Sequence, residues 1–264
     1  MEEQSARTMY LDLLRKTVTG QIIEDKPKYA FSQPRLSAWL RPSRFDRKRR
    51  EEGKDVPTLA HTMIGARRMK NVQYCMEDVL RAGVPGDFIE TGVWRGGATI
   101  FMRGVLKAYG VTDRRVWVAD SFAGLPKPDA KRFPTDRWLR FDLMPYFAVS
   151  EREVRDNFEK YDLLDAQVCF LKGWFKDTLP QAPIASLAVM RLDGDLYEST
   201  MDALVHLYPK LSVGGYVIID DYVMPSCAKA VHDYRAAHGI TEPMVDIDGA
   251  GRYWKRTTAP GAAT

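Results

Sequence analysis

The chain has 264 residues, of which 45% are hydrophobic and 28% charged, and its formal net charge is +4. This length and composition are sufficient for one large globular domain or two small ones, and they exclude a disordered or fibrous chain. No stretch approaches the roughly 18 consecutive apolar residues of a membrane helix, and no signal-peptide pattern opens the chain. We therefore expect a cytoplasmic protein without membrane contact.

The N-terminal part combines a helical pattern with a strongly basic segment. Apolar residues recur at helical spacing over residues 5–22, which predicts an amphipathic helix. Residues 26–50 hold nine basic side chains against one acidic one, so this segment is +8 and the remainder of the chain −4. Because that remainder is mildly acidic, it lacks a broad phosphate-binding surface, and we expect no nucleic acid partner. We interpret residues 1–56 as a helix followed by a solvated basic arm or lid.

The next segments change from helical periodicity to an alternation of short apolar runs and helices. A helix is predicted over residues 58–81. Apolar runs at 87–91, 116–120, 168–172, 187–192 and 216–219 then alternate with helical segments at 97–109, 150–163, 197–210 and 226–238. Because most runs are apolar at successive positions, they are typical of strands buried on both faces of a doubly wound parallel α/β sheet. Two last runs, 244–247 and 252–255, are separated by a short turn, so the final strand should be antiparallel.

A glycine-rich turn follows the first of these strands. Its sequence is Glu90-Thr91-Gly92-Val93-Trp94-Arg95-Gly96-Gly97. Glycines let a ligand approach the backbone, and the following helix offers free N–H groups, although a tight structural turn would also use glycines. Asp120 ends the second strand, where a carboxylate is suited to bind ribose hydroxyls. The combination favours ligand binding.

Acidic residues follow two later strands. Asp193 and Asp195 lie in MRLDGDLYEST, and Asp220 and Asp221 lie in GGYVIIDDY. If the two strands are neighbours, Asp193, Asp220 and Asp221 meet at one sheet edge, where their like charges need a cation. All-oxygen ligation suits magnesium, manganese or calcium better than zinc. The alternative is that these acids only cap loops and helices.

Five segments in this order resemble the TylF-like family of S-adenosylmethionine-dependent sugar O-methyltransferases, of the macrocin, mycinamicin and novobiocin type. The segments are ETGVWRGG, WVADSFAGLP, GWFKDTLP, RLDGDLYEST and GGYVIIDDY. The resemblance spans roughly residues 57–254. It implies a class I methyltransferase (Rossmann-like) fold with seven strands, S-adenosylmethionine as methyl donor, Mg²⁺, and a small-molecule glycoside acceptor with a deoxysugar hydroxyl, as in antibiotic biosynthesis. It further implies a catalytic domain over residues 57–264 with an acceptor lid at about 127–148.

The resemblance also assigns roles to residues. It implies cofactor contacts from Thr62, Met63, Glu90, Gly92, Trp94, Arg95, Asp120, Ser121, Gly173 and Trp174. It implies metal ligation by Asp193, Asp220 and Asp221. We expect Asp193 or Asp195 to take the proton of the acceptor hydroxyl, with the choice between them open. The lid aromatic residues Trp138, Phe141, Tyr146 and Phe147 are candidates for an apolar acceptor wall, although a packed lid would have the same composition.

Other functions are compatible with parts of the pattern. A catechol-type methyltransferase uses a similar metal site, but that group generally has Asp-Asn where this chain has Asp220-Asp221. A non-catalytic nucleotide-binding protein and an NAD oxidoreductase are further alternatives, which the acidic cluster disfavours. The N-terminal helix and arm lead us to expect a homo-oligomer.

Overall fold

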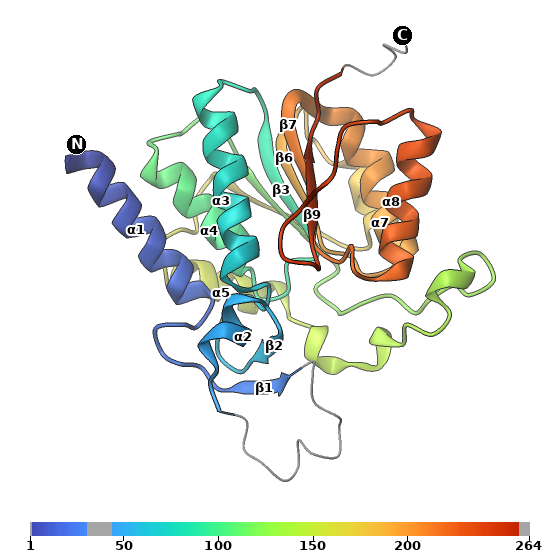
Figure 1. Ribbon diagram of the computed structural model, residues 1–264, viewed down its shortest axis with the longest axis horizontal. Helices are drawn as coiled ribbons and strands as arrows, with labels where there is room; N and C mark the ends of the chain where they lie inside the picture. Colours follow the sequence, from blue (N-terminus) through green and yellow to red (C-terminus); the bar gives the residue numbers. More distant parts are fainter. Residues whose placement is uncertain (1, 31–43, 259–264) are drawn as a thin grey trace.

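The fold is a seven-stranded sheet between two layers of helices, as seen in a computed structural model that describes residues 2–30 and 44–258 (Figure 1). The sheet order is β5-β4-β3-β6-β7-β9-β8. Its strands are β3 (Asp87–Thr91), β4 (Val116–Asp120), β5 (Val168–Lys172), β6 (Leu187–Leu192), β7 (Leu211–Ile219), β8 (Val245–Asp246) and β9 (Arg252–Lys255). The first five in this order are parallel, and β9 is antiparallel to β7 and β8. The predicted fold class and the antiparallel last strand are confirmed.

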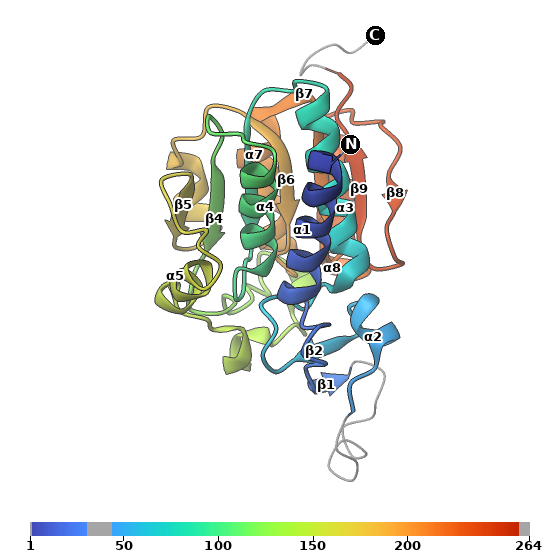
Figure 2. The same cartoon turned by 90° about the vertical axis from the view of Figure 1, so that its left-hand side faces the viewer.

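Helices cover both faces of the sheet, as Figures 1 and 2 show. The helices are α1 (Glu2–Val18), α2 (Arg47–Glu51), α3 (Gly65–Arg81), α4 (Gly97–Ala108), α5 (Glu151–Glu159), α6 (Phe175–Thr178), α7 (Tyr197–Leu207) and α8 (Pro225–Ala237). Consecutive strand residues face opposite layers: Phe88 packs with α3 and α4, and Ile89 packs with α7 and α8. This two-sided burial explains why the strand segments are continuously apolar. None of the helices in the described ranges is long and apolar enough to cross a membrane.

The predicted helix over residues 58–81 begins only at Gly65. The preceding segment, residues 58–64, is a loop fixed by backbone hydrogen bonds. The carboxylate of Asp25 accepts from the N–H groups of Leu59 and Ala60, at 2.7 and 2.8 Å, and the next two N–H groups donate to the carbonyl of Val18. These partners lie outside the segment, so local periodicity carried no sign of them.

The basic N-terminal segment is only partly described, since residues 31–43 lie outside the described residues. The flanking chain forms a two-stranded antiparallel sheet of β1 (Pro27–Ala30) and β2 (Asp55–Pro57). Arg50 of α2 is fully buried and forms an ion pair with Asp55. The interpretation of this run as a solvated arm is therefore wrong for Arg50, which is a core residue. The domain boundary at residue 56 stays a prediction.

Residues 127–148 lie across the carboxyl ends of the parallel strands (Figure 1). They form three short 3₁₀ helices, η1 (Pro134–Asp136), η2 (Phe141–Leu143) and η3 (Pro145–Phe147). Two more 3₁₀ turns, η4 (Leu179–Gln181) and η5 (Tyr208–Lys210), end α6 and α7. We call residues 127–148 the lid.

Candidate active site

A cavity of about 920 Å³ opens at the carboxyl ends of the parallel strands. Its walls come from the loops that follow β3, β4, β5, β6 and β7, together with the lid and residues from the segments before and after β2. This is the edge at which open parallel sheets bind ligands, and the volume is in the range of roughly 300–1,000 Å³ that holds a small molecule.

The turn after β3 has glycine where the backbone requires it. Gly92 adopts a φ of 82°, and a Cβ there would overlap the carbonyl oxygen of Asp193. Gly96 has a φ of 83° at the start of α4. Glycine adopts left-handed conformations without strain, and at Gly92 no larger residue would fit against Asp193. The approach at Gly92 brings the glycine-rich turn against the acidic loop that follows β6.

Asp120 organises this turn. Its carboxylate accepts hydrogen bonds from the N–H groups of Val93 and Phe122, both at 2.8 Å. Burial raises the pKa of Asp120, and these backbone donors oppose the rise. The backbone carbonyl of Asp120 accepts from the N–H of Gly173 at 2.9 Å, which joins the ends of β4 and β5. Asp120 thus shapes the cavity wall that it also lines.

Nine of the ten residues that we predicted to bind the cofactor line the cavity. They are Thr62, Met63, Glu90, Gly92, Trp94, Asp120, Ser121, Gly173 and Trp174. Arg95 is the exception, because its guanidinium packs 4.2 Å from the Trp94 ring and donates to the carbonyls of Thr58 and Ala60. The structure places Arg95 outside the cavity, where these hydrogen bonds stabilise the loop over residues 58–64.

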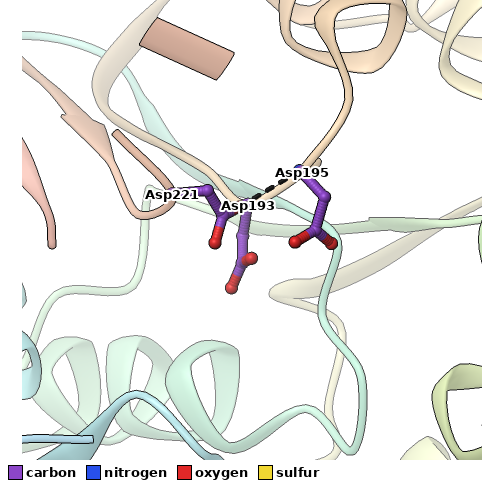
Figure 3. A group of neighbouring side chains, drawn as sticks. All are labelled: Asp193, Asp195 and Asp221. Carbon is purple, nitrogen blue, oxygen red and sulfur yellow. Dashed lines mark hydrogen bonds between the residues drawn. The ribbon is translucent and has the colours of Figure 1, made fainter. Parts of the chain in front are cut away.

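Three acidic side chains converge in the cavity (Figure 3). Carboxylate oxygens of Asp193, Asp195 and Asp221 all lie within 4.8 Å of one another, and the N–H of Asp195 donates to Asp221 at 3.1 Å. They meet because β6 and β7 are parallel neighbours. Burial, together with the neighbouring carboxylates, raises the pKa of each carboxyl, to about 8 for Asp195. A cation would lower these pKa values again.

Asp220 has a different environment from the one that we predicted. Its carboxylate pairs with Arg68 of α3 and with Arg191 of β6. Asp193 and Asp221 belong both to the predicted ligand set and to the observed cluster, whereas Asp195 occupies the third place in that cluster. The two arginines explain the difference, because between them they pair with both carboxylate oxygens of Asp220.

Arg68 and Arg191 were missed in the sequence. Arg191 is fully buried and contacts Glu90 and, at 3.0 Å, Asp193. Arg68 also reaches Asp248 in the β8–β9 turn at 3.1 Å. The one signal for Arg191 was a charged residue inside an otherwise apolar strand segment, LAVMRL, two positions before Asp193.

The charges around the cavity do not balance. Arg68 and Arg191 pair with Glu90, Asp193, Asp220 and Asp248, whereas Asp195 and Asp221 have no ion pair among the described residues. Acidic side chains also outnumber basic ones along the whole cavity wall. Among the described residues, Glu90 Oε2 is buried without a hydrogen-bond partner. Buried carboxylates in excess are unfavourable unless a positive ligand neutralises them. A divalent cation and a positively charged sulfonium compound both fit this donor set.

The lid supplies the apolar part of the cavity wall. Phe141, Met144 and Phe147 line the cavity. Tyr146 instead packs against Trp94, with 5.3 Å between ring centroids and the rings tilted by 45°, and Trp138 is 78% exposed. Of the four lid aromatics considered in the sequence, two therefore face the cavity.

Comparison with known proteins identifies relatives along almost the whole chain. The family model described as macrocin-O-methyltransferase (TylF) matches residues 7–256. The chain is 53% identical to a tetracenomycin rhamnosyl 4'-O-methyltransferase of Streptomyces olivaceus, over 97% of this chain and 95% of that protein. It is 50% identical to mycinamicin III 3''-O-methyltransferase of Micromonospora griseorubida, over 97% and 100%. The solved structure of the O-methyltransferase NovP is similar with a TM-score of 0.86 and 51% identity, covering 96% of this chain and all of NovP.

Proposed function

Because the chain belongs to the TylF macrocin-O-methyltransferase family and is an O-methyltransferase, we propose that it transfers a methyl group from S-adenosylmethionine to a sugar hydroxyl. The acceptor sugar is a deoxysugar on a glycosylated natural product of antibiotic biosynthesis. One observation carries this proposal: the glycine-rich turn and the acidic cluster share one cavity and meet where Gly92 approaches Asp193. Donor and acceptor bound at these two places would be neighbours.

The acceptor class is supported by the relatives and by the lid. One relative is named for methylation of a rhamnosyl group, and another for a 3''-hydroxyl of mycinamicin III. A deoxysugar presents hydroxyl groups together with an apolar methyl group. The cavity offers carboxylates on one side and the lid residues Phe141, Met144 and Phe147 on another, which matches those two kinds of surface.

The transfer requires the loss of one proton. The hydroxyl oxygen attacks the methyl carbon of the sulfonium, the carbon–sulfur bond breaks, and its electron pair stays on sulfur in the departing S-adenosylhomocysteine. The hydroxyl proton passes to a carboxylate, which we assign to Asp193 or Asp195. Both side chains lie in the loop after β6, next to the glycine-rich turn. Holding the oxygen and the methyl group in line supplies much of the remaining acceleration.

We further propose that the acidic cluster holds Mg²⁺. Asp193, Asp195 and Asp221 are the candidate ligands in the observed arrangement, and Asp220 could join only by leaving Arg68 or Arg191. A divalent cation there supplies Lewis-acid polarisation of the acceptor hydroxyl. Arg191 orients Asp193 through an ion pair, and Asp221 accepts a hydrogen bond from the N–H of Asp195. These contacts hold the three carboxylates in place.

A panel experiment tests the function. The purified protein is incubated with methyl-labelled S-adenosylmethionine and either deoxysugar glycosides or catechols, with Mg²⁺ or with chelator. We expect label in the glycosides only, and only with Mg²⁺. Label in catechols alone would favour the catechol-type alternative. Full activity with chelator, with metal content checked by elemental analysis, would remove the metal from the proposal.

Asparagine variants identify the ligands and the base. Asp193→Asn, Asp195→Asn and Asp220→Asn are each assayed over a Mg²⁺ titration, with Mg²⁺ binding measured separately by calorimetry. A ligand variant should bind Mg²⁺ more weakly and recover activity at high Mg²⁺. A variant of the base should not recover. Unchanged Mg²⁺ affinity in Asp220→Asn would leave Asp195 as the third ligand.

A further inference from the structure

The helix that follows the acidic loop begins without a cap of its own. The first N–H groups of any α-helix have no partner within the helix and need an acceptor. Leu196, at the N-cap position of α7, has no side-chain acceptor to offer. Asp136 of the lid, 61 residues before Tyr197, supplies it: its two carboxylate oxygens accept from the N–H groups of Tyr197 and Glu198, at 2.8 and 3.2 Å.

We propose that Asp136 is a positioning residue, which couples the position of the acceptor lid to the geometry of the catalytic loop over residues 193–196. The inference rests on the function proposed above for that loop. Asp136 is 1% exposed, whereas Trp138, two residues away, is 78% exposed. A carboxylate at the positive end of a helix forms charge-assisted hydrogen bonds, which are stronger than those of a neutral cap. Asp136 is therefore the point at which this part of the lid is fixed.

A second contact joins the same two segments. The rings of Phe133 and Tyr197 lie 5.5 Å apart, and the Tyr197 hydroxyl donates to Asp233 of α8 at 2.9 Å. Tyr197 is thus held by the lid through its backbone and its ring, and by α8 through its hydroxyl. A shift of the lid would release two of these three contacts together.

The loop before Tyr197 has a conformation that depends on such support. Asp195 has a φ of 57°, which is unfavourable for a residue other than glycine. Conformations of this kind persist where the surroundings hold them. Ser226 donates to the carbonyl of Asp195 at 3.1 Å, and the N–H of Asp195 donates to Asp221 at 3.1 Å. The Asp136 cap fixes the chain only two residues further on.

The other end of the lid is attached to the glycine-rich turn. The indole N–H of Trp94 donates to the carbonyl of Tyr146 at 3.1 Å. Phe141 and Met144, which face the cavity, lie between the two attachments, and Phe147, which also faces it, directly follows the second. An acceptor that packs against these side chains stabilises the docked lid, and the docked lid orders the loop that carries Asp193 and Asp195.

Two variants of Asp136 and one matched control test this coupling in the full-length chain. Asp136→Ala removes both acceptors, whereas Asp136→Asn keeps one. The control is Asp129→Ala, since Asp129 is a lid carboxylate that accepts from the N–H groups of Lys131 and Arg132 only within the lid. The measurements are kcat, KM for the glycoside, the Kd of S-adenosylmethionine by calorimetry, and amide hydrogen exchange of residues 194–200.

We expect Asp136→Ala to lower kcat roughly 10- to 100-fold and to speed exchange at the start of α7, as for the loss of two charge-assisted cap bonds. The donor Kd should change less than about twofold, because the donor side of the cavity is untouched. Asp136→Asn should recover part of kcat. A structural role alone would lower the melting temperature and leave kcat of the folded protein unchanged, so that pattern would overturn the inference.

Two more outcomes would overturn the proposed coupling between the lid and the catalytic loop. Wild-type exchange at residues 194–200 in Asp136→Ala would show that the cap does not order the loop. An equal loss of kcat in Asp129→Ala would show that any lid change suffices. If Asp136→Ala does not fold, Asp136→Asn decides by the same measures. Failure of the proposed function is distinct, because the wild-type protein would then methylate no glycoside, whereas the exchange measurement would still report on the coupling.

Discussion

Two buried clusters of charge in the described part of the chain differ in how completely their groups are paired. In the N-terminal region, Arg50 binds Asp55 through two pairs of atoms at 2.9 Å and lies 3.8 Å from Asp25. Its remaining N–H groups donate to the carbonyls of Thr19 and Asp25, at 3.1 and 2.7 Å. The carboxylate of Asp25 accepts from the backbone N–H groups of Leu59 and Ala60. This cluster is satisfied by the protein itself.

The cluster at the cavity is not satisfied in this way. Arg68 and Arg191 pair with four of its carboxylates, and among the described residues Asp195 and Asp221 have no ion pair and the buried Glu90 Oε2 has no hydrogen-bond partner. Both clusters bury arginine beside aspartate, so burial alone does not distinguish structure from function. The pairing of the buried groups does, because carboxylates without a partner in the protein persist where a positive ligand completes the set.

The largest effect is expected at the cavity cluster, whose carboxylates are incompletely paired. Asp193→Asn should lower kcat by about 1,000-fold, which is within the range for loss of a general base or of a metal ligand. Because the change removes one of several like charges, the melting temperature should stay the same or rise. Enzyme assays and thermal unfolding without ligand measure the two effects. If Asp193→Asn instead lowered the melting temperature and left kcat of the folded protein unchanged, the cavity cluster would be structural, like the N-terminal one.

The N-terminal cluster, whose groups are satisfied by the protein, should respond in the opposite way. Arg50→Met leaves two buried carboxylates without their cation and should lower the free energy of unfolding by about 3 kcal/mol. The kcat of the folded fraction should stay within a few-fold of wild type. Arg49→Met is the control, since Arg49 is partly exposed and its pair with Asp46 is long, at 3.9 Å; its effect should be below about 0.5 kcal/mol. Denaturant unfolding checks both values.

Asp120 belongs to neither cluster and tests whether the donor side is independent of the acidic side. Asp120→Ala removes the acceptor for Val93 and Phe122 and the predicted acceptor for ribose, so S-adenosylmethionine binding should weaken by about 2 kcal/mol. Mg²⁺ affinity, measured in the same calorimeter, should not change. Wild-type donor affinity in a folded variant would remove Asp120 from the donor site. Asp113→Ala, at an exposed position, is the control.

The smallest effect concerns His61, a half-buried neutral group in the loop over residues 58–64. Burial and the charges of Lys160 and Arg95 lower the pKa of His61 to about 4, and its ring nitrogen lies 2.7 Å from the Tyr161 hydroxyl. The unfolded state has an ordinary histidine pKa of about 6.5, so it binds more protons between pH 6.5 and 4. The contribution of His61 to stability is complete above pH 6.5 and is lost as the pH falls toward 4.

Melting temperatures of the wild type and of His61→Gln at pH 7.5, 5.5 and 4.5 check this sign. On acidification, the melting temperature of the wild type should fall further than that of His61→Gln. His232→Gln, at an exposed position on α8, should follow the wild type. Parallel curves for the wild type and His61→Gln would show that His61 does not contribute to acid destabilisation.

The sheet and much of the cavity wall could be predicted from the sequence because their signals are local. The segment DFIET is apolar on both faces because Phe88 and Ile89 enter different helical layers. The position of Asp193 at the end of β6, and of Asp221 just after the end of β7, places them at one edge of the sheet as soon as the two strands are neighbours. A strand pattern and the acidic residue that follows it can both be recognised from a few consecutive residues.

Only the tertiary structure decided which partners the buried charged groups have. Arg68 lies 152 residues before Asp220, and Asp136 lies 61 residues before the helix that it caps. The loop over residues 58–64 is not helical because Asp25 and Val18 bind its N–H groups. A hydrogen bond or an ion pair depends on distances of a few ångströms and not on sequence spacing. The residue types therefore indicated that carboxylates gather at this edge, and only folding determined which of them are neutralised by arginine and which face the ligand.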